Sequence, residues 1–248
     1  ASSEAASDAT SDTASAEVTT VEPGKLIMST NAAFPPYEMT ADDGSFEGID
    51  VEIAGAIAEK LGLELQIDDM DFDAALLAAQ TGKSDMVMAG VTVTEDRQTV
   101  MDFSDSYAAG IQVVIVPEDS DIASIDDMTG KMIGVQRGTT GDQYCSASVE
   151  DGGFGEENVT RYDNGLTAVQ ALNNGQVDCV VIDNAPAQEF VAANPGLKIL
   201  DTEYANEEYA IGVAKGNTQL LDAINTAIAE LKADGTIQSI LDKYISAE

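Results

Sequence analysis

The sequence predicts an α/β fold built from two similar units in tandem, each a parallel sheet covered by helices. Three observations lead to this prediction. Short apolar strands alternate with amphipathic helices over residues 26–89, the same alternation restarts after residue 117, and two further helices follow residue 217. A chain of 248 residues, 44% of them hydrophobic, can form one large domain or two small ones with a real core.

The first unit is expected to run strand, helix, strand, helix, strand. Apolar residues every four positions from Ile53 to Leu61 predict a helix, and Gly62 suits the C-cap that ends it. We expect Asp73 to cap the next helix and Gly82 to end it. The predicted elements are strand 26–29, helix 50–61, strand 63–67, helix 73–80 and strand 85–89.

The second unit repeats this order after a strongly apolar strand. Tight loop residues, Gly138 to Gly141, precede one helix, and Asn164 and Asn184 are expected to cap two others. The two C-terminal helices look too short a unit to fold alone. The predicted strands are 111–116, 131–135, 159–162, 177–182, 197–200 and 209–214, and the helices follow residues 141, 164, 184 and 217, with a last one over 237–244.

The charge balance excludes several classes of function. Acidic residues outnumber basic ones by 45 to 11, for a formal net charge of −34, whereas a phosphate-binding surface is basic, so nucleic acid is not an expected partner. The chain has no histidine, which removes histidine triads, zinc–histidine sites and histidine acid–base catalysis. No apolar run approaches the roughly 20 residues of a membrane span.

Neither a metal nor a cofactor is needed to interpret the sequence. The acidic run Asp68–Asp71 lacks the ligand spacing and the glycine of an EF-hand, so we expect it to be solvated. Cys145 and Cys179 can pair or remain separate thiols, and the spacing does not decide between these alternatives. Cys179 lies in an apparent buried strand, which favours an inert core thiol.

The N-terminal segment, residues 1–20, is acidic and rich in Ser, Ala and Thr, with almost no large apolar side chain. Such a segment cannot bury enough surface to offset its ordering entropy, so we expect a disordered spacer. A plain frayed terminus is the alternative.

The stretch from Gly90 to Arg97 is the first candidate for a binding site. It follows an apolar strand and ends in Thr94 and two acidic residues, which suit the cap and first turn of a helix. This geometry brings backbone N–H groups, the Thr92 hydroxyl and the Arg97 guanidinium together, a set that suits a carboxylate. The alternative is an ordinary capped helix with Arg97 on a solvated face.

Four segments in this order and spacing carry a resemblance to a known family. They are Asn31–Glu38, Gly48–Ile53, Gly90–Arg97 and Asp102–Tyr107. With them the chain resembles the polar amino-acid-binding proteins of bacterial ABC importers, the extracellular solute-binding family 3, from about residue 26 to residue 244. Any one of these segments alone would be weak evidence for the family, whereas the four together form a specific pattern.

The resemblance implies a two-lobed, periplasmic-binding-protein-like fold of type II, with two hinge crossings and a ligand cleft between the lobes. The crossings are expected near 107–111 and 205–209. Lobe 1 would comprise residues 21–108 plus 208–248, and lobe 2 residues 109–207. The cleft between such lobes is a natural ligand site.

A free amino acid offers a carboxylate, an ammonium group and a side chain. For the carboxylate we expect Arg97, which matches the family's carboxylate-binding arginine, with Thr92 and the region of Gly90. Thr139 and Thr140 stand at the start of a helix, which favours an anion, although ordinary capping is the alternative.

For the ammonium group we expect Asp183, at the carboxyl end of a strand, with the Gly90 carbonyl and the Thr92 hydroxyl accepting the remaining protons. The alternative for Asp183 is an N-cap, a role that Asn184 can also fill. The candidates for the ligand's side chain are Asn31, Phe34, Glu38, Phe72 and Gln136.

The resulting hypothesis is capture of a polar or cationic L-amino acid outside the cell and delivery to an ABC permease. Two aromatic rings, Phe34 and Phe72, can sandwich a guanidinium that reaches Glu38, which favours arginine or lysine slightly over glutamine. The protein is expected to be a monomer and not an enzyme, although a dehydratase-like enzyme and a receptor's sensing domain are alternatives. The resemblance also implies a lipid-modified N-terminal cysteine, absent from this chain, that tethers the protein to the extracellular face of the cell membrane. The periplasm is the alternative location.

Overall fold

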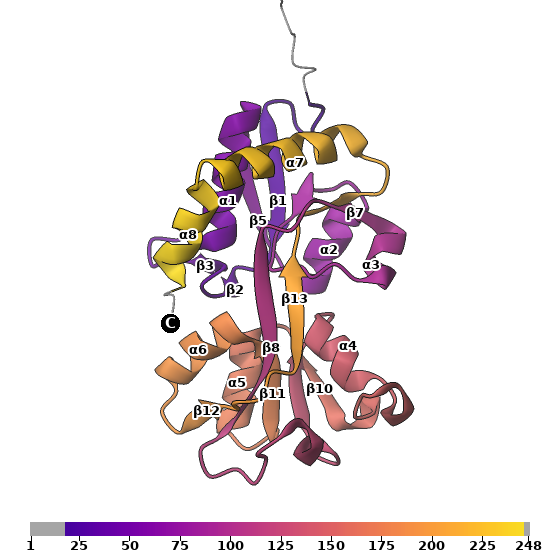
Figure 1. Ribbon diagram of the computed structural model, residues 1–248, viewed down its shortest axis with the longest axis vertical. Coiled ribbons are helices and arrows are strands. Elements are labelled where there is room, and N and C mark those ends of the chain that lie inside the picture. The colour runs from indigo at the N-terminus through magenta and orange to yellow at the C-terminus, as the bar shows by residue number, and fades with distance from the viewer. Residues whose placement is uncertain (1–17, 246–248) are drawn as a thin grey trace, which may run out of the picture.

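The computed structural model describes residues 18–245 and shows two lobes joined by two neighbouring strands (Figure 1). Strand β8 (Ala108–Pro117) runs from the first lobe into the second, and β13 (Ala205–Tyr209) returns beside it. The two strands pair antiparallel, with Gln112 opposite Ala205. The two-lobed α/β fold with two crossings is therefore confirmed, whereas the lobe boundaries at 21–108 with 208–248 and at 109–207 stay a prediction.

The first lobe holds a five-stranded sheet in the order β5-β1-β6-β14-β7. Strand β1 runs parallel to β5 and β6, but β14 runs antiparallel to β6 and β7. The parallel arrangement predicted for the three strands of the first unit is therefore confirmed. The complete sheet is mixed, because β14 belongs to the returning chain and enters this sheet from the other lobe. The strands are β1 (Lys25–Thr30), β5 (Glu64–Asp69), β6 (Met86–Val87), β7 (Met101–Phe103) and β14 (Gly212–Ala214).

The second lobe holds a six-stranded sheet in the order β10-β9-β11-β8-β12, with β13 paired to β8. Strands β9, β10 and β11 are parallel, while the hinge strand β8 runs antiparallel to β11 and β12. The last residues of β9 and β11, Gln136 and Asp183, line the cavity between the lobes, at the carboxyl ends of strands where α/β sheets place ligand contacts. The strands are β9 (Ile133–Gln136), β10 (Val159–Tyr162), β11 (Cys179–Asp183) and β12 (Leu197–Ile199).

A small third sheet, which the sequence does not predict, lies at the cleft side of the first lobe. Its strands hold only two or three residues, too few to show any periodicity. The pairing places Phe34 directly opposite Glu38, so one hairpin carries both side chains to the same place. The strands are β2 (Ala33–Phe34), β3 (Glu38–Thr40) and β4 (Phe46–Glu47).

The C-terminal helices return to the first lobe, where α7 and α8 pack against α1 (Figure 1). Buried apolar side chains at i, i+4 and i+8 on both α1 and α7 fill this contact, among them Ile53 and Ile57 facing Ile224 and Ile228 in one core cluster. The helices are α1 (Ile49–Leu61), α2 (Phe72–Gln80), α3 (Glu95–Val100), α4 (Thr140–Ser146), α5 (Gly165–Asn173), α6 (Asn184–Ala193), α7 (Thr218–Ala233) and α8 (Thr236–Tyr244), with short 3-10 turns η1 (Ile125–Met128), η2 (Val149–Asp151) and η3 (Glu156–Asn158).

Two predicted helix caps are wrong by one or two residues. Helix α2 begins at Phe72 with Asp71 as its N-cap residue, so Asp73 lies in the first turn. The buried ring of Phe72 holds this start in place, since it is part of an apolar cluster. At α6 the N-cap residue is Asp183, and Asn184 is already helical.

The strand predicted over 209–214 is in fact two strands. β13 ends at Tyr209 and β14 begins at Gly212, and between them the Ala210 N–H donates to the Val91 carbonyl oxygen at 3.0 Å. The chain leaves the partner strand β8 in one sheet and joins β6 and β7 in the other, so the ladder must break there.

Residues 1–17 of the predicted disordered spacer lie outside the described residues. The last three residues of the segment are described, and Val18 packs against the main core. Among the helices of residues 18–245, none combines the length and the apolar composition needed to cross a membrane.

Both cysteines are free thiols in the apolar core of the second lobe. Burial raises the pKa of Cys145 to about 12 and also raises that of Cys179. Both groups are therefore protonated at neutral pH, as expected of inert core thiols.

Candidate functional site

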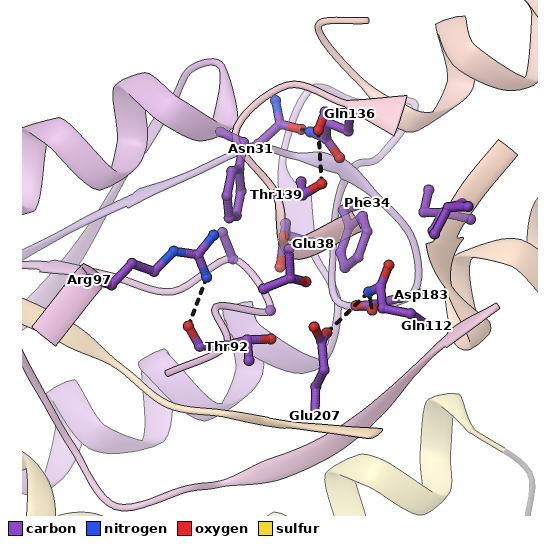
Figure 2. Close-up of a pocket in the computed structure, with 16 residues that line it drawn as sticks. Asn31, Phe34, Glu38, Thr92, Arg97, Gln112, Gln136, Thr139, Asp183 and Glu207 are labelled. Atoms are coloured by element: carbon purple, nitrogen blue, oxygen red, sulfur yellow. Dashed lines mark hydrogen bonds between the residues drawn. The ribbon is translucent and has the colours of Figure 1, made fainter. Parts of the chain in front are cut away.

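A small cavity lies between the lobes, with side chains from both in its walls (Figure 2). All eleven residues that the sequence nominates line this one cavity. The first lobe contributes Asn31, Phe34, Glu38, Phe72, Gly90, Thr92 and Arg97, the second contributes Gln136, Thr139, Thr140 and Asp183, and the residues not foreseen are Ala89, Gln112, Val181, Ile182 and Glu207.

Arg97 lies on α3 and is only 6% exposed, so the alternative of a solvated arginine is wrong. The Thr94 hydroxyl accepts from the Arg97 backbone N–H at 3.2 Å, which confirms the predicted cap and fixes the start of the helix. Nη1 donates to the Thr92 carbonyl oxygen at 2.7 Å, and Nη2 donates to the Gly138 carbonyl oxygen at 3.1 Å. Among the described residues Nε has no partner, so donors remain for a carboxylate.

Burial affects the pKa of this guanidinium. It lowers the pKa of Arg97 to about 10, with the nearby Glu207 and Tyr144 acting in the opposite direction, so the group stays charged at neutral pH. The Phe72 ring lies 5.5 Å from the guanidinium carbon and contributes a cation–π contact. Phe72 therefore supports the predicted carboxylate-binding group at one face of its ring.

Gly90 stands where only glycine fits. Its φ is +56°, a conformation that side chains rarely adopt, and a Cβ there would lie 3.0 Å from the Phe34 ring. Its N–H donates to Asp50 Oδ2 at 2.9 Å and is therefore not free for a ligand carboxylate. The Gly90 carbonyl remains for the predicted contact with an ammonium group.

Thr139 and Thr140 begin α4 at the edge of the second lobe. The Thr139 hydroxyl accepts from the Asp142 N–H at 3.3 Å and donates to the Gln136 carbonyl oxygen at 2.8 Å, so this side chain is a helix cap. Thr140 is buried at the first helical position, where backbone N–H groups have no acceptor within the helix. Its N–H is thus the better candidate for an anion.

Asp183 ends β11 with its carboxylate in the cavity and is 4% exposed. Its side chain makes no capping bond to α6, so the capping alternative is wrong for this carboxylate. Instead the Gln112 amide and the Tyr209 hydroxyl donate to its two oxygens. Burial and the charges of Glu207 and Asp50 raise the pKa of Asp183 well above its ordinary value.

Glu38 is completely buried beside Phe34. Within residues 18–245 no N–H or hydroxyl group donates to either of its carboxylate oxygens, and the buried carboxyl group of Asp50 is close enough to interact with it through a side-chain hydrogen bond. Burial first, and then the charges of Asp50 and Asp183, raise the pKa of Glu38 well above its ordinary value. A carboxylate in this position is stabilised by a ligand that carries a positive charge or donates hydrogen bonds.

Asn31 and Gln136 bond to each other across the cleft. Gln136 Nε2 donates to Asn31 Oδ1 at 2.9 Å, and Asn31 Nδ2 donates to the Met70 carbonyl oxygen at 2.9 Å. Both amides line the cavity, as predicted, but they also form a direct contact between the lobes.

The main polar residues that the sequence interpretation missed are Gln112 and Glu207, which lie on the two hinge strands. Gln112 is a polar residue inside the apolar strand β8, an anomaly that sequence inspection can detect. Glu207 carries no such signal, since it stands among polar neighbours in a segment that resembles an exposed loop. No cluster of three or more His, Cys, Asp or Glu side chains suited to a metal ion occurs in the part of the chain that is described.

The fold and the interlobe cavity together define a two-lobed ligand-binding protein. The chain belongs to the bacterial extracellular solute-binding proteins, family 3, whose family model matches residues 26–247. It is 31% identical to the L-cystine-binding protein TcyJ of Escherichia coli (strain K12) over 230 residues, 92% of this chain and 85% of that protein.

Two solved structures of an ancestral arginine-binding protein are also similar. The arginine-bound form is 42% identical with a TM-score of 0.83, covering 90% of this chain and 99% of that one. The glutamine-bound form is 41% identical with a TM-score of 0.84, covering 91% of this chain and 100% of that one. These relatives bind different amino acids, so the ligand class has to be argued from the cavity itself.

Proposed function

We propose that this protein captures a free L-amino acid in the interlobe cavity and delivers it to an ABC permease. The observation that carries the proposal is that Arg97 of the first lobe and Asp183 of the second line the same buried cavity. A guanidinium and a carboxylate facing one space match the carboxylate and the ammonium group of a zwitterion. The relatives named as cystine-binding and arginine-binding proteins support an amino acid as the ligand.

In this function the protein only binds its ligand and closes around it. A ligand that contacts both lobes stabilises the closed state by its differential affinity, and the permease then recognises closure. No bond is made or broken, and no metal or cofactor takes part. The protein acts as a monomer outside the cell or in the periplasm, tethered through a lipidated N-terminal cysteine that is not part of this chain.

The charge of the cavity favours a cationic side chain. Four buried carboxylates, those of Glu38, Asp50, Asp183 and Glu207, lie in or next to the cavity, and Arg97 is the positively charged group that lines it. Glu38 lies opposite Phe34, and in the described part of the protein its polar neighbour is another acid, Asp50. A guanidinium or ammonium can therefore rest on the ring and neutralise this acidic pair. Arginine or lysine is therefore preferred over glutamine.

A thermal-shift screen of the twenty amino acids plus ornithine, citrulline and cystine tests the proposal, followed by calorimetry on the best ligands. We expect a large upward shift of the unfolding temperature with arginine or lysine, a smaller one with glutamine, and none with aspartate. Absence of a shift with every compound would exclude the amino-acid-binding function.

The enzyme alternative is checked in the same samples. Each amino acid is incubated with the protein and followed by NMR, and we expect the ligand to be recovered unchanged. Any product formed in proportion to protein concentration would favour the dehydratase-like alternative.

A further inference from the structure

Glu207 is a buried acid on the hinge. It lies on β13, is 6% exposed, and points its carboxylate into the cavity between Thr92 and Asp183 (Figure 2). Its neighbour Glu208, on the same strand, is exposed. The alternation of the strand therefore directs one of two consecutive glutamates into the candidate site.

The Glu207 carboxylate is held by two neutral donors. Gln112 Nε2 donates to Oε2 at 3.0 Å, and the Tyr144 hydroxyl donates to Oε1 at 3.1 Å. The same Gln112 nitrogen also donates to Asp183. Two buried carboxylates therefore share one amide nitrogen and lie within two hydrogen-bond lengths of each other.

In the described part of the protein, neither of these carboxylates forms a direct ion pair. Among residues 18–245, no lysine or arginine forms an ion pair with Asp183 or Glu207. Like charges that are buried this close destabilise each other unless a proton or a cation lies between them. The arrangement is thus unfavourable in the empty protein and favourable around a cation.

The position of Glu207 indicates which cation this is. The charge of Glu207 acts on Arg97 on one side and on Asp183 on the other. An amino-acid zwitterion whose carboxylate contacts Arg97 and whose ammonium group lies near Asp183 would also lie next to the Glu207 carboxylate. An ammonium group has three N–H donors, and the Thr92 hydroxyl on the far side of Glu207 offers a further acceptor.

We infer that Glu207 is a second carboxylate of the ammonium subsite and contacts the α-ammonium group of the ligand together with Asp183. The inference rests on the proposed function and extends it to a residue outside the predicted site. With two acids at this end, the cavity selects ligands that carry a free α-ammonium group, whatever their side chain. N-acylated amino acids and hydroxy acids are rejected, because they leave both carboxylates without a cation.

Glu207→Gln tests this inference, because the amide can still accept from Gln112 and donate to the Tyr144 oxygen. The affinity for arginine and for glutamine should fall by the same factor, about tenfold to a hundredfold, as for loss of one charged hydrogen bond. At a pH above the raised pKa of Asp183, where both acids are charged, the ligand-free variant should unfold at a higher temperature than the unmodified protein, since one of two repelling charges is gone. Glu208→Gln removes the same charge from the exposed neighbour and should change neither ligand affinity.

Three results would overturn the inference. Unchanged affinity would show that Glu207 does not contact the ligand, and a loss confined to arginine would place it at the side-chain end of the cavity. A lower or unchanged unfolding temperature of the ligand-free variant would mean that Glu207 only supports the hinge. Failure of the proposed function is distinguishable, because the unmodified protein would then bind neither amino acid.

Discussion

Arg97 Nη2 of the first lobe donates a 3.1 Å hydrogen bond to the Gly138 carbonyl oxygen of the second lobe. The residue proposed to grip the ligand's carboxylate thus also joins the two lobes directly. Because a guanidinium has five donors, it can keep this bond while a carboxylate occupies others. The same side chain can therefore sense the ligand and hold the closed arrangement.

Arg97→Ala should abolish tight binding. We expect a loss of about 3 kcal/mol or more in binding free energy, since a charge-assisted pair in a buried cavity disappears together with the interlobe bond. Calorimetry with arginine measures the loss. Arg137→Ala, which removes a half-exposed arginine next to Gly138, is the control and should bind normally. Equal affinity of the Arg97 variant and the unmodified protein would refute the assignment.

Asp183→Asn should lower the binding affinity for every amino acid by on the order of a hundredfold, because a charged partner of the ammonium group is lost. Since the Asp183 side chain does not cap α6, the helix should remain intact, which far-UV circular dichroism checks. Normal binding combined with reduced helix content would restore the capping explanation.

Glu38→Gln should change selectivity more than overall affinity. The variant keeps the shape of the side chain but removes the charge expected to pair with a guanidinium. The affinity for arginine should therefore fall about tenfold or more, while the affinity for glutamine should change little. The ratio of the two affinities, measured in parallel titrations, is the readout. Glu47→Gln on the neighbouring strand β4 removes an exposed acid and is the matched control. An unchanged ratio of the two affinities would show that Glu38 does not contact the ligand's side chain.

Binding of a cationic ligand should release protons. The pKa values of Glu38 and Asp183 are both raised well above the ordinary values, so both groups take up protons at a higher pH than free carboxyl groups do, and a bound cation opposes this uptake. Affinity for arginine should therefore fall as the pH is lowered below 7. Calorimetry in two buffers with different ionisation heats counts the released protons, and Glu38→Gln should reduce the count. A proton count of zero at every pH would contradict the shifts.

The same raised pKa values set the direction of a stability change. A carboxyl group whose pKa is higher in the folded than in the unfolded protein binds more protons when folded, so its contribution to stability is greatest below about pH 4. That contribution is lost as the pH rises through the folded-state value. Comparing the pH dependence of unfolding in the unmodified protein and in Glu38→Gln isolates the contribution of Glu38 from the general effect of the many surface acids.

Asn31→Ala should favour the open form of the ligand-free protein, because it removes the hydrogen bond from Gln136 across the cleft. Small-angle scattering should show a larger radius of gyration without ligand and the same radius with saturating ligand. Gln176→Ala, which truncates an exposed amide in the second lobe, should leave both radii unchanged. Equal ligand-free radii for the Asn31 variant and the unmodified protein would show that this bond does not influence closure.

The sequence by itself determined what depends on neighbours along the chain. Apolar spacing fixed the cores of α1 and α7, Thr94 and Asn164 marked helix starts through their own side chains, and the order of segments indicated the family. Asp183 was predictable as a candidate because it stands at the carboxyl end of an apolar strand, and Arg97 because its segment matches the family.

Only the tertiary structure decided what depends on distant segments. Gln112 and Glu207 are 95 residues apart, yet the pairing of β8 with β13 brings their side chains together, and no local pattern encodes that register. The short sheet that sets Phe34 opposite Glu38 has no periodicity to detect. The lack of a capping bond from the Asp183 side chain likewise depends on distant groups, because Gln112 and Tyr209 donate to its carboxylate.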